Sequence, residues 1–553
     1  MLSVRRAPAV LPRLGRVVLA AALAAGTVWS GAAIHAAPAG AVEPNFPSYD
    51  SGYHNLPEMV AEIQQAAVDY PNLVQISSIG KSYQGRDIWI AKVSNDVAVD
   101  HGYPEVLIDA LHHAREHLST EQALAVLRWL TTGYGHDAAV TSLMNSRVVW
   151  IIFALNPDGF RYDLTGTPFR GWRKNRQPTA GTNAIGTDLN RNYAYRFGCC
   201  GGSSGNPSSI IYRGASSFSA PETRALRDFV ASRVIGGVQR IKTHVTLHTN
   251  GKLILWPYGY TKTAVPSDMT LLDHNALAAM GRGMAALNGY KAEQSSALYV
   301  TDGDEIDWLY GRYRIFSYTF ELYPAETGTV LGDFYPDDSH IGPETARNRS
   351  ALLRLIDRAG CVYADLGSTY ARADCGPMYD DFEINRGWVR NSQGTDTATG
   401  GLWQIGVPHA TADAGGAKQV GKAVSGRSVL ATGLAAGTNA NANDVDGGRT
   451  TATSAAVTLP ATPGLLTFRY SFAHDAKSST ADSFQVLVQT ADGQRVPVFT
   501  IRGRASNLNA AWATGSAVLT PWAGQTIRIV VAATDGGAAS LVEVAVDDMR
   551  IIR

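Results

Sequence analysis

The spacing of apolar residues alternates along the chain between that of helices and that of buried strands. Residues 59–68 and 124–130 repeat apolar side chains at helical intervals. Short apolar runs between and after these segments are typical of strands buried inside a sheet. The four runs are Glu105–Leu111, Val148–Leu155, His244–His248 and Ile315–Leu322. This alternation predicts an α/β fold with a mixed central sheet flanked by helices.

The pattern changes after Cys375-Gly376-Pro377, where Gly, Ala, Thr, Asp and Asn become frequent. Apolar residues then alternate with smaller or polar ones over residues 466–472, 484–488 and 527–531, as strands with one buried face do. We therefore predict a large α/β domain over residues 42–376. An all-β, jelly-roll-like sandwich is predicted to follow over residues 377–553.

The N-terminal residues have the order of a secretory signal peptide. Four arginines come before an apolar stretch from Val17 to Ala37, and the small residues Ala39-Gly40-Ala41 follow it. We assign residues 1–41 to the signal peptide and expect a secreted protein without a membrane anchor after cleavage. An uncleaved anchor is the alternative, but Gly, Ser, Thr and His within the stretch argue against it.

Composition narrows the function classes. The chain of 553 residues has 48 Lys and Arg and 48 Asp and Glu, which argues against the overall positive field of a nucleic-acid binder. It has 4 cysteines, and in an exported chain we expect them to form disulfides. Four cysteines allow three connectivities, among which the sequence does not choose; one of them pairs Cys199 with Cys200 and Cys361 with Cys375.

Three residues that could bind a metal lie where predicted strands end. His113 and Glu116 follow the run that ends at Leu111, and His248 closes a later run. Because α/β sheets place ligands at the carboxyl ends of their strands, we expect these side chains to meet. Two histidines and one carboxylate form a zinc site with a position open for water. The H-x-x-E pattern alone is weak evidence, since so short a pattern recurs by chance.

Charged residues elsewhere strengthen this interpretation. Glu321 ends a strongly apolar strand, where burying a carboxylate without a purpose is costly. A structural ion pair with an arginine is the alternative explanation. Two cationic segments, residues 172–176 and 188–193, carry the planar donors that suit bidentate capture of a carboxylate.

Taken together, these motifs make residues 49–360 resemble the zinc metallocarboxypeptidases of the carboxypeptidase A type. The resemblance implies an exopeptidase that hydrolyses the C-terminal peptide bond of peptides and proteins. It implies His113, Glu116 and His248 as ligands of one Zn²⁺, and Glu321 as the base that activates the zinc-bound water. The other implied roles are oxyanion stabilisation by Arg173, substrate-carboxylate binding by Asn190, Arg191 and Tyr299, and an outer subsite at Arg115.

The resemblance also places residues 303–308 at the bottom of the specificity pocket. Ile306 stands where the family uses an apolar residue for hydrophobic substrates, and Asp304 and Glu305 add carboxylates beside it. We expect a hydrophobic preference, or a broad one that also accepts C-terminal Lys and Arg. If both acids point to solvent, only the hydrophobic preference remains.

The predicted sandwich carries acidic residues near its start, middle and end. They are Asp380, Asp381, Glu383, Asp444, Asp446, Asp547 and Asp548. These acids are candidates for a Ca²⁺ site, and solvated turn residues are the alternative. The region resembles jelly-roll modules of secreted hydrolases, which leaves binding of a polymer or cell surface and a role in stability both open.

Two other functions compete with a carboxypeptidase. A hydrolase of peptidoglycan peptides or amides could use the same scaffold, but Asn190, Arg191 and Tyr299 favour ordinary peptide C-termini. A non-catalytic binding protein would have no reason to keep Glu321 beside a metal. We therefore expect a metallocarboxypeptidase whose partners are peptides with a free C-terminal carboxylate.

Overall fold

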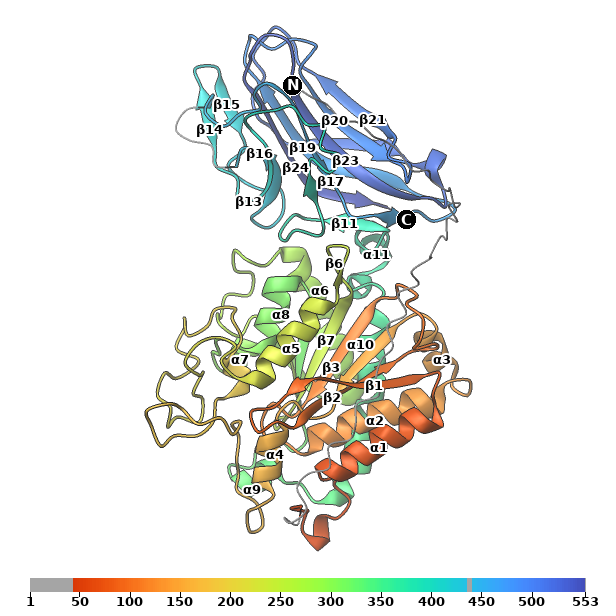
Figure 1. The fold of residues 1–553 in the computed structure, drawn as a ribbon, viewed down its shortest axis with the longest axis vertical. Coiled ribbons are helices and arrows are strands. Elements are labelled where there is room, and N and C mark those ends of the chain that lie inside the picture. Colours follow the sequence, from red (N-terminus) through yellow and green to blue (C-terminus); the bar gives the residue numbers. More distant parts are fainter. Residues whose placement is uncertain (1–42, 435–439, 553) are drawn as a thin grey trace, which may run out of the picture. The chain divides into compact units, whose positions relative to one another are not determined.

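The computed structural model describes residues 43–434 and 440–552 (Figure 1). The predicted signal peptide, residues 1–41, lies outside the described residues. Within the described ranges, no helix is both long enough and apolar enough to cross a membrane.

The N-terminal part of the fold is built from helices and strands in alternation. Its helices are α1 (Leu56–Asp69), α2 (Leu118–Gly133), α3 (Ala138–Met144), α4 (Pro157–Asp163), α5 (Pro221–Ser232), α6 (Leu271–Asn288), α7 (Ser295–Leu298), α8 (Glu305–Tyr313), α9 (Val330–Phe334), α10 (Ile341–Arg358) and α11 (Ser368–Asp374). Its strands are β1 (Val74–Lys81), β2 (Asp87–Val93), β3 (Glu105–Ala110), β4 (Val148–Ile152), β5 (Val234–Ile235), β6 (Val238–Gln239), β7 (Ile241–Thr249), β8 (Leu253–Trp256), β9 (Lys291–Gln294) and β10 (Phe316–Leu322).

Eight of these strands form one mixed sheet in the order β1-β2-β4-β3-β7-β10-β8-β9. The central strands β4, β3, β7 and β10 run parallel, whereas β1 and β2 pair antiparallel with their neighbours. β8 is antiparallel to β10 and parallel to β9. The four predicted strands are confirmed as β3, β4, part of β7, and β10. The predicted mixed α/β sheet is therefore correct.

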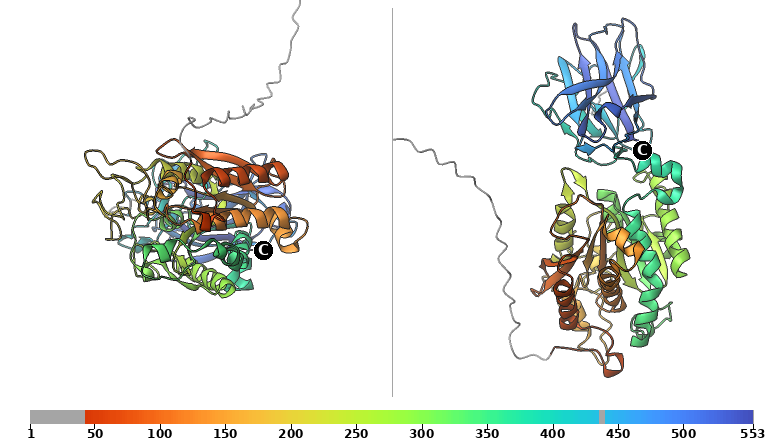
Figure 2. Two further views of the ribbon diagram at one scale, coloured as in Figure 1. Left: turned by 90° about the horizontal axis from the view of Figure 1, so that it is seen from below. Right: turned by 90° about the vertical axis from the view of Figure 1, so that its right-hand side faces the viewer.

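Helices cover both faces of this sheet, and β3 in its centre is therefore buried along its whole length. In β3, Val106 and Ile108 pack into the core that contains residues of α1, α2, α6 and α10. Leu107, between them, packs on the other face into a core with residues of α5 and α8. A strand buried on both faces reads as a continuous apolar run, which explains the pattern in the sequence. Figure 2 shows these layers from two further directions.

The first predicted helical face matches α1 in part. The helix begins at a capping box in which Asn55 Oδ1 accepts from Glu58 N at 3.0 Å and Glu58 Oε2 accepts from Asn55 N at 2.9 Å. Met59 and Ile63 are buried, as predicted, but Val68 is 71% exposed. The last turn of α1 thus extends beyond the core that its first turns cover.

The C-terminal part is all-β, as predicted. Its strands are β11 (Met378–Asp380), β12 (Val389–Arg390), β13 (Trp403–Gly406), β14 (Thr411–Asp413), β15 (Gly416–Gln419), β16 (Val429–Thr432), β17 (Gly448–Thr453), β18 (Val457–Thr458), β19 (Leu465–His474), β20 (Ser483–Gln489), β21 (Arg495–Arg502), β22 (Ala513–Val518), β23 (Thr526–Asp535) and β24 (Val542–Ile551). Twelve of them form two antiparallel sheets, β13-β16-β24-β19-β22 with β11 on β24, and β12-β17-β23-β20-β21 with β18 on β23. The other two, β14 and β15, pair with each other. Alternate residues of β19, β20, β23 and β24 share one core between these sheets.

The acidic residues of the all-β part do not support the calcium site. Although β11 and β24 are neighbours, as a shared site would require, the carboxylates have other partners. Asp547 Oδ2 accepts from Val424 N at 2.7 Å, Glu383 Oε1 accepts from Ser428 N at 2.7 Å, and Asp381 pairs with Arg386 at 3.4 Å. None of the metal-compatible residue groups among the described residues lies in this part. Backbone donors and an arginine are thus the partners of Asp547, Glu383 and Asp381.

The cysteines form two disulfides, as expected, and the structure has one of the three connectivities that the sequence leaves open. Cys361 pairs with Cys375, and Cys199 pairs with its neighbour Cys200.

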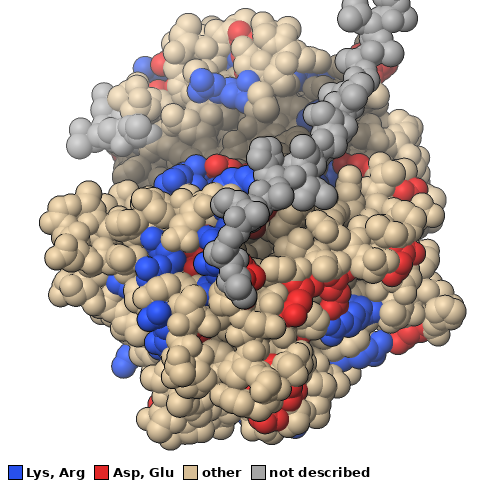
Figure 3. All heavy atoms as spheres, turned by 60° about the horizontal axis from the view of Figure 1, so that its bottom comes forward, with Lys and Arg blue, Asp and Glu red and all other residues tan. Residues whose placement is uncertain are grey.

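On the face shown in Figure 3, basic and acidic side chains lie in neighbouring groups rather than in a field of one sign. This distribution agrees with the formal net charge of +0.

Candidate active site and metal centre

Three adjacent parallel strands bring the predicted catalytic residues to one edge of the sheet. His113 and Glu116 lie in the loop between β3 and α2, whereas His248 is in β7 and Glu321 is in β10. In the register of β7 and β10, His248 is directly opposite Glu321, and β3 aligns its last residue with Leu247. The carboxyl ends of all three strands therefore meet at one point, as α/β sheets arrange their ligand sites.

His113, Glu116 and His248 converge on one point. The Nδ1 atoms of the two histidines lie 3.1 Å apart, His113 Nδ1 is 2.8 Å from Glu116 Oε1, and His248 Nδ1 is 2.9 Å from Glu116 Oε2. The three residues are at most 3% exposed. Two imidazole nitrogens that face each other beside a carboxylate form a donor set that fits Zn²⁺ and keeps a further position open.

The surroundings of His248 and Glu116 keep these two side chains in the protonation states that a metal needs. Burial lowers the pKa of His248 from 6.5 to about 4, although Glu116 opposes this shift. Burial alone would raise the pKa of Glu116, but His113 and His248 outweigh it and hold this pKa below the ordinary value. At neutral pH the group is thus a neutral imidazole beside a carboxylate, which are the ligand forms that bind zinc.

Asp188 is a functional candidate that the sequence reasoning did not single out. Its Oδ1 lies 3.1 Å from His113 Nε2, and its Oδ2 accepts a hydrogen bond from Arg173 Nε at 3.0 Å. A carboxylate on the outer nitrogen of a ligating histidine fixes the orientation of the ring. A signal for it exists in the sequence, because Asp188 is the first residue of the cationic segment 188–193.

Arg173 and Glu321 face the metal ligands. The Arg173 side chain is 11% exposed, and its Nη1 lies 4.0 Å from Glu116 Oε1. Burial raises the pKa of Glu321 well above its usual range, the Glu116 charge adds to this rise, and Arg173 and Arg191 oppose it. A carboxylate that takes up a proton this readily, beside a metal centre, is suited to act as a general base.

Arg191 offers a free donor next to this centre. The residue is 1% exposed, its Nε donates to Gly202 O at 2.9 Å, and its Nη1 donates to Asn190 O at 2.6 Å. The remaining nitrogen, Nη2, is buried and has no hydrogen-bond partner. Tyr299, which is 50% exposed, places its ring 5.8 Å from the Arg191 guanidinium carbon. Nη2 is therefore the guanidinium nitrogen of Arg191 that is left for a ligand.

Asp304 and Glu305 do not point to the same place. Asp304 is the N-cap of α8: its Oδ1 accepts from Asp307 N at 2.9 Å and its Oδ2 accepts from Thr301 Oγ1. Glu305 instead places its carboxylate 3.3 Å from His112 Nε2. Consecutive residues at a helix start project in different directions, so grouping both acids in one pocket was too simple. Neither acid points to solvent, since both are at most 3% exposed.

A second buried polar cluster, also missed from the sequence, surrounds Glu305. His244 Nε2 lies 2.6 Å from Asp109 Oδ2 and 3.4 Å from Glu305 Oε1. His112 contacts both acids and stacks on the ligand His248, with ring centroids 5.5 Å apart. Through the His112 ring, the cluster thus packs against His248. Asp109 and His244 appeared in the sequence only as polar positions inside apolar strands.

The last two predicted residues lie at the margin of the site. Arg115 is 9% exposed, and its guanidinium carbon lies 3.9 Å from the centroid of the Phe334 ring. Ile306 is 2% exposed on the first turn of α8, next to Asp304. The metal ligands, Arg173 and Glu321 therefore lie together, whereas Glu305 belongs to the second buried cluster at His112.

Comparison with known proteins agrees with this geometry. A family model described as zinc carboxypeptidase matches residues 59–351. The chain is 47% identical over 325 residues to a zinc carboxypeptidase of Saccharothrix mutabilis subsp. capreolus, a match that covers 59% of this chain and 74% of that protein. It is 34% identical over 308 residues to carboxypeptidase A1 of Homo sapiens, covering 55% of this chain and 70% of that protein.

A solved structure adds the same conclusion from the fold. The crystal structure of carboxypeptidase A from Helicoverpa armigera matches with a TM-score of 0.50 and 28% identity, covering 57% of this chain and 75% of that chain. On the family match over more than half of the chain, and on the metal centre at the edge of the sheet, this chain belongs to the zinc carboxypeptidase family, whose members are metallo-exopeptidases.

Proposed function

We propose that this chain removes single residues from the C-termini of peptides outside the cell, with a preference for hydrophobic and basic C-terminal residues. His113, Glu116 and His248 would hold one Zn²⁺. When bound, this ion supplies a Lewis acid that polarises the scissile carbonyl and acidifies water. The observation that carries the proposal is the buried, unpartnered Nη2 of Arg191 beside that centre.

The choice of a terminal bond follows from Arg191. A free C-terminal carboxylate would satisfy its Nη2, whereas an internal peptide bond would leave a buried guanidinium nitrogen without a partner. Asn190 is suited to share the carboxylate. Its Oδ1 accepts from the backbone N–H of Glu305 at 3.0 Å, which leaves the side-chain NH₂ group as the donor to a carboxylate. Tyr299, half exposed, is suited to cover the bound carboxylate from the solvent side.

Proton transfer and charge stabilisation fall to Glu321 and Arg173. Glu321 would take the proton of the attacking water and pass it to the leaving amine. Arg173, held by Asp188 at 3.0 Å, would donate to the oxygen that gains charge as the carbonyl becomes tetrahedral. Because Asp188 already fixes the guanidinium, little reorganisation is needed when this charge develops.

The broad preference rests on Asp304. Its carboxylate is 3% exposed, and its hydrogen-bond partners, Thr301 Oγ1 and Asp307 N, are both neutral groups. A C-terminal Lys or Arg side chain would give this buried acid a charged partner. Ile306, the next buried apolar residue on α8, supports acceptance of Phe, Tyr or Leu.

Cleavage of two matched substrates tests the terminal-bond requirement. Benzyloxycarbonyl-Gly-Phe with a free carboxylate should be hydrolysed, and the same compound as a C-terminal amide should not. Arg191→Ala should weaken binding of the free acid by about 1.5–3 kcal/mol, the range for a hydrogen bond to a charged group. Arg191→Lys, which keeps the charge, should lose less. Equal cleavage of acid and amide would contradict the proposal and favour an amide hydrolase.

A further inference from the structure

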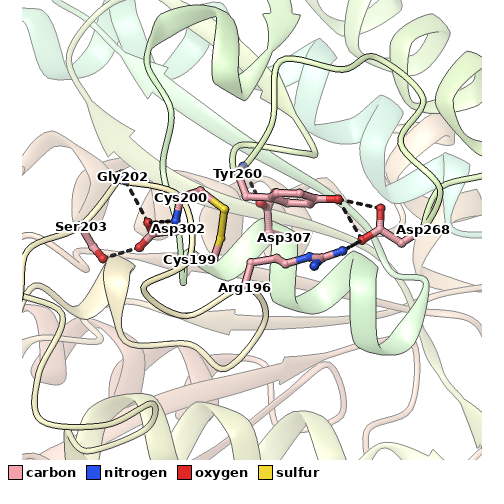
Figure 4. Close-up of a disulfide and its surroundings, with 9 residues drawn as sticks. All are labelled: Arg196, Cys199, Cys200, Gly202, Ser203, Tyr260, Asp268, Asp302 and Asp307. Atoms are coloured by element: carbon pink, nitrogen blue, oxygen red, sulfur yellow. Dashed lines mark hydrogen bonds and ion pairs between the residues drawn. A yellow bond between two sulfur atoms is a disulfide. The ribbon is translucent and has the colours of Figure 1, made fainter.

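The buried carboxylate of Asp302 anchors the loop that contains the Cys199–Cys200 disulfide (Figure 4). Its Oδ2 accepts from Cys200 N at 3.0 Å and from Gly202 N at 2.9 Å, and its Oδ1 accepts from Ser203 Oγ. Asp302 is 0% exposed. One carboxylate from the segment before α8 therefore binds three donors of this loop, all of them neutral.

The anchored loop in turn holds the arginine of the candidate carboxylate site. Gly202, whose N–H Asp302 binds, uses its carbonyl oxygen to accept from Arg191 Nε at 2.9 Å. A Cβ atom on Gly202 would lie 2.4 Å from the backbone of Thr301. The loop is thus pressed against the segment that carries Tyr299, and Gly202 has no room to shift in that direction.

Two more contacts join the same segments. Tyr193 N donates to Gly303 O at 2.9 Å, and Glu305 N donates to Asn190 Oδ1 at 3.0 Å. With the Gly202 carbonyl, they tie Asn190 and Arg191 to the residues around Asp302. The direction of the free Nη2 is therefore set by the fixed positions of Nε and Nη1.

We propose that Asp302 is a positioning residue, which holds the Gly202 carbonyl so that Arg191 presents Nη2 to the substrate carboxylate. This inference rests on the proposed role of Arg191 and deepens it. Asp302 itself touches no reacting atom, since its oxygens are used by the loop. If it is replaced by Ala, the N–H groups of Cys200 and Gly202 lose their acceptor and the Gly202 carbonyl is no longer fixed.

Two inhibitors separate positioning of Arg191 from general support of the site. 2-Benzylsuccinic acid is a dicarboxylate that can use the metal and Arg191 together, whereas acetohydroxamic acid binds a metal without a second carboxylate. In Asp302→Ala we expect the inhibition constant for benzylsuccinate to rise about tenfold and that for acetohydroxamate to stay within twofold. For a blocked dipeptide ending in Phe, KM should rise more than kcat falls.

Matched variants make the result specific. Asp268 binds the same loop at Arg196, with 2.6 Å between Arg196 Nη2 and Asp268 Oδ2 (Figure 4), so Asp268→Asn should leave the ratio of the two inhibition constants unchanged. Asp302→Asn, which keeps one acceptor oxygen, should give an intermediate ratio, and it decides the question if Asp302→Ala does not fold. An equal loss of affinity for both inhibitors, or no loss of affinity for either, would overturn the proposal.

The parent proposal has its own control. In an Arg191→Ala background, the Asp302 variants should no longer change the ratio of the two inhibition constants. If Arg191→Ala leaves the binding of benzylsuccinate unchanged, the carboxylate-binding role of Arg191 fails. If only the Asp302 variants leave it unchanged, the positioning role fails and the carboxylate site stands.

Discussion

Asp188 joins His113 to Arg173, with Oδ1 3.1 Å from His113 Nε2 and Oδ2 3.0 Å from Arg173 Nε. One buried carboxylate thus orients a metal ligand and the arginine proposed to stabilise the transition state. Burial would raise the pKa of Asp188, but Arg173 and His113 outweigh it and hold this pKa well below the ordinary value. It therefore stays an acceptor for both neighbours at neutral pH.

Loss of that charge should weaken two functions at once. In Asp188→Asn, we expect zinc affinity to fall about 10- to 100-fold, the usual effect of removing an outer partner of a ligating histidine. At saturating zinc, kcat should still be reduced because Arg173 is no longer held. Competition with a zinc chelator measures the affinity, and Asp268→Asn is the control, because Asp268 binds Arg196 and Tyr260 instead of a metal ligand. Unchanged zinc affinity would show that His113 does not depend on Asp188.

The specificity of the pocket should depend on Asp304 and not on Glu305. Asp304→Ala should reduce kcat/KM for a blocked dipeptide ending in Arg far more than for one ending in Phe. Glu305→Gln should not change this ratio, because its carboxylate lies 3.3 Å from His112, in the second buried cluster. An equal loss on Arg and Phe substrates in Asp304→Ala would reduce Asp304 to its capping role on α8.

Acid should destabilise the zinc-free protein. In the folded chain burial lowers the pKa of His248 from 6.5 to about 4, so between these values the unfolded chain holds more protons. The free energy of unfolding should therefore fall as pH is lowered from about 6.5 to about 4. At about 1.4 kcal/mol per pKa unit, the loss reaches about 3 kcal/mol.

Glu116 extends this trend to lower pH, because its pKa is also held below the ordinary value. Urea unfolding of the zinc-free protein across this range gives the slope. In His248→Gln, which has no titrating ring at this position, the slope between pH 6.5 and 4 should be smaller. The same slope in both proteins would contradict the assignment to His248.

The two disulfides should differ in what they contribute to stability. Cys361 and Cys375 are separated by 14 positions and border the main core, so their bridge closes a real loop. Replacing both with Ser should lower the free energy of unfolding by about 3 kcal/mol. Replacing Cys199 and Cys200, which are adjacent, should cost much less by the same chain-entropy argument. Denaturant unfolding measures the two losses in free energy of unfolding. Equal losses would show that loop closure does not explain the stabilisation by these disulfides.

The strands and metal ligands were predictable because their signals are local. A strand such as β3, buried on both faces, requires a continuous apolar run, and His113 and Glu116 directly follow it. Glu321 stood out because a carboxylate is rare in such a strand. These features need no knowledge of the tertiary fold beyond the rule that ligands gather at carboxyl strand ends.

The remaining features depend on side-chain direction and on contacts far apart in the sequence. Glu305 follows Asp304 directly, yet it joins His112 and His244, 193 and 61 positions before it. Asp188 lies 75 positions from His113, whose ring it orients. The acids of the all-β part matched a calcium pattern, but Ser428 and Val424 donate backbone hydrogen bonds to them. Such partners are set by tertiary packing, which residue spacing does not encode.

Zinc-dependent release of Phe from benzyloxycarbonyl-Gly-Phe tests the proposed enzyme most directly. Purified protein should release Phe, a zinc chelator should abolish this activity, and added Zn²⁺ should restore it. Glu321→Gln should bind zinc as the unaltered chain does and lose at least about 10²-fold in kcat, the contribution of a general base. Release of Phe that survives zinc removal, or full activity in Glu321→Gln, would contradict the assignment of His113, Glu116, His248 and Glu321 as the catalytic centre.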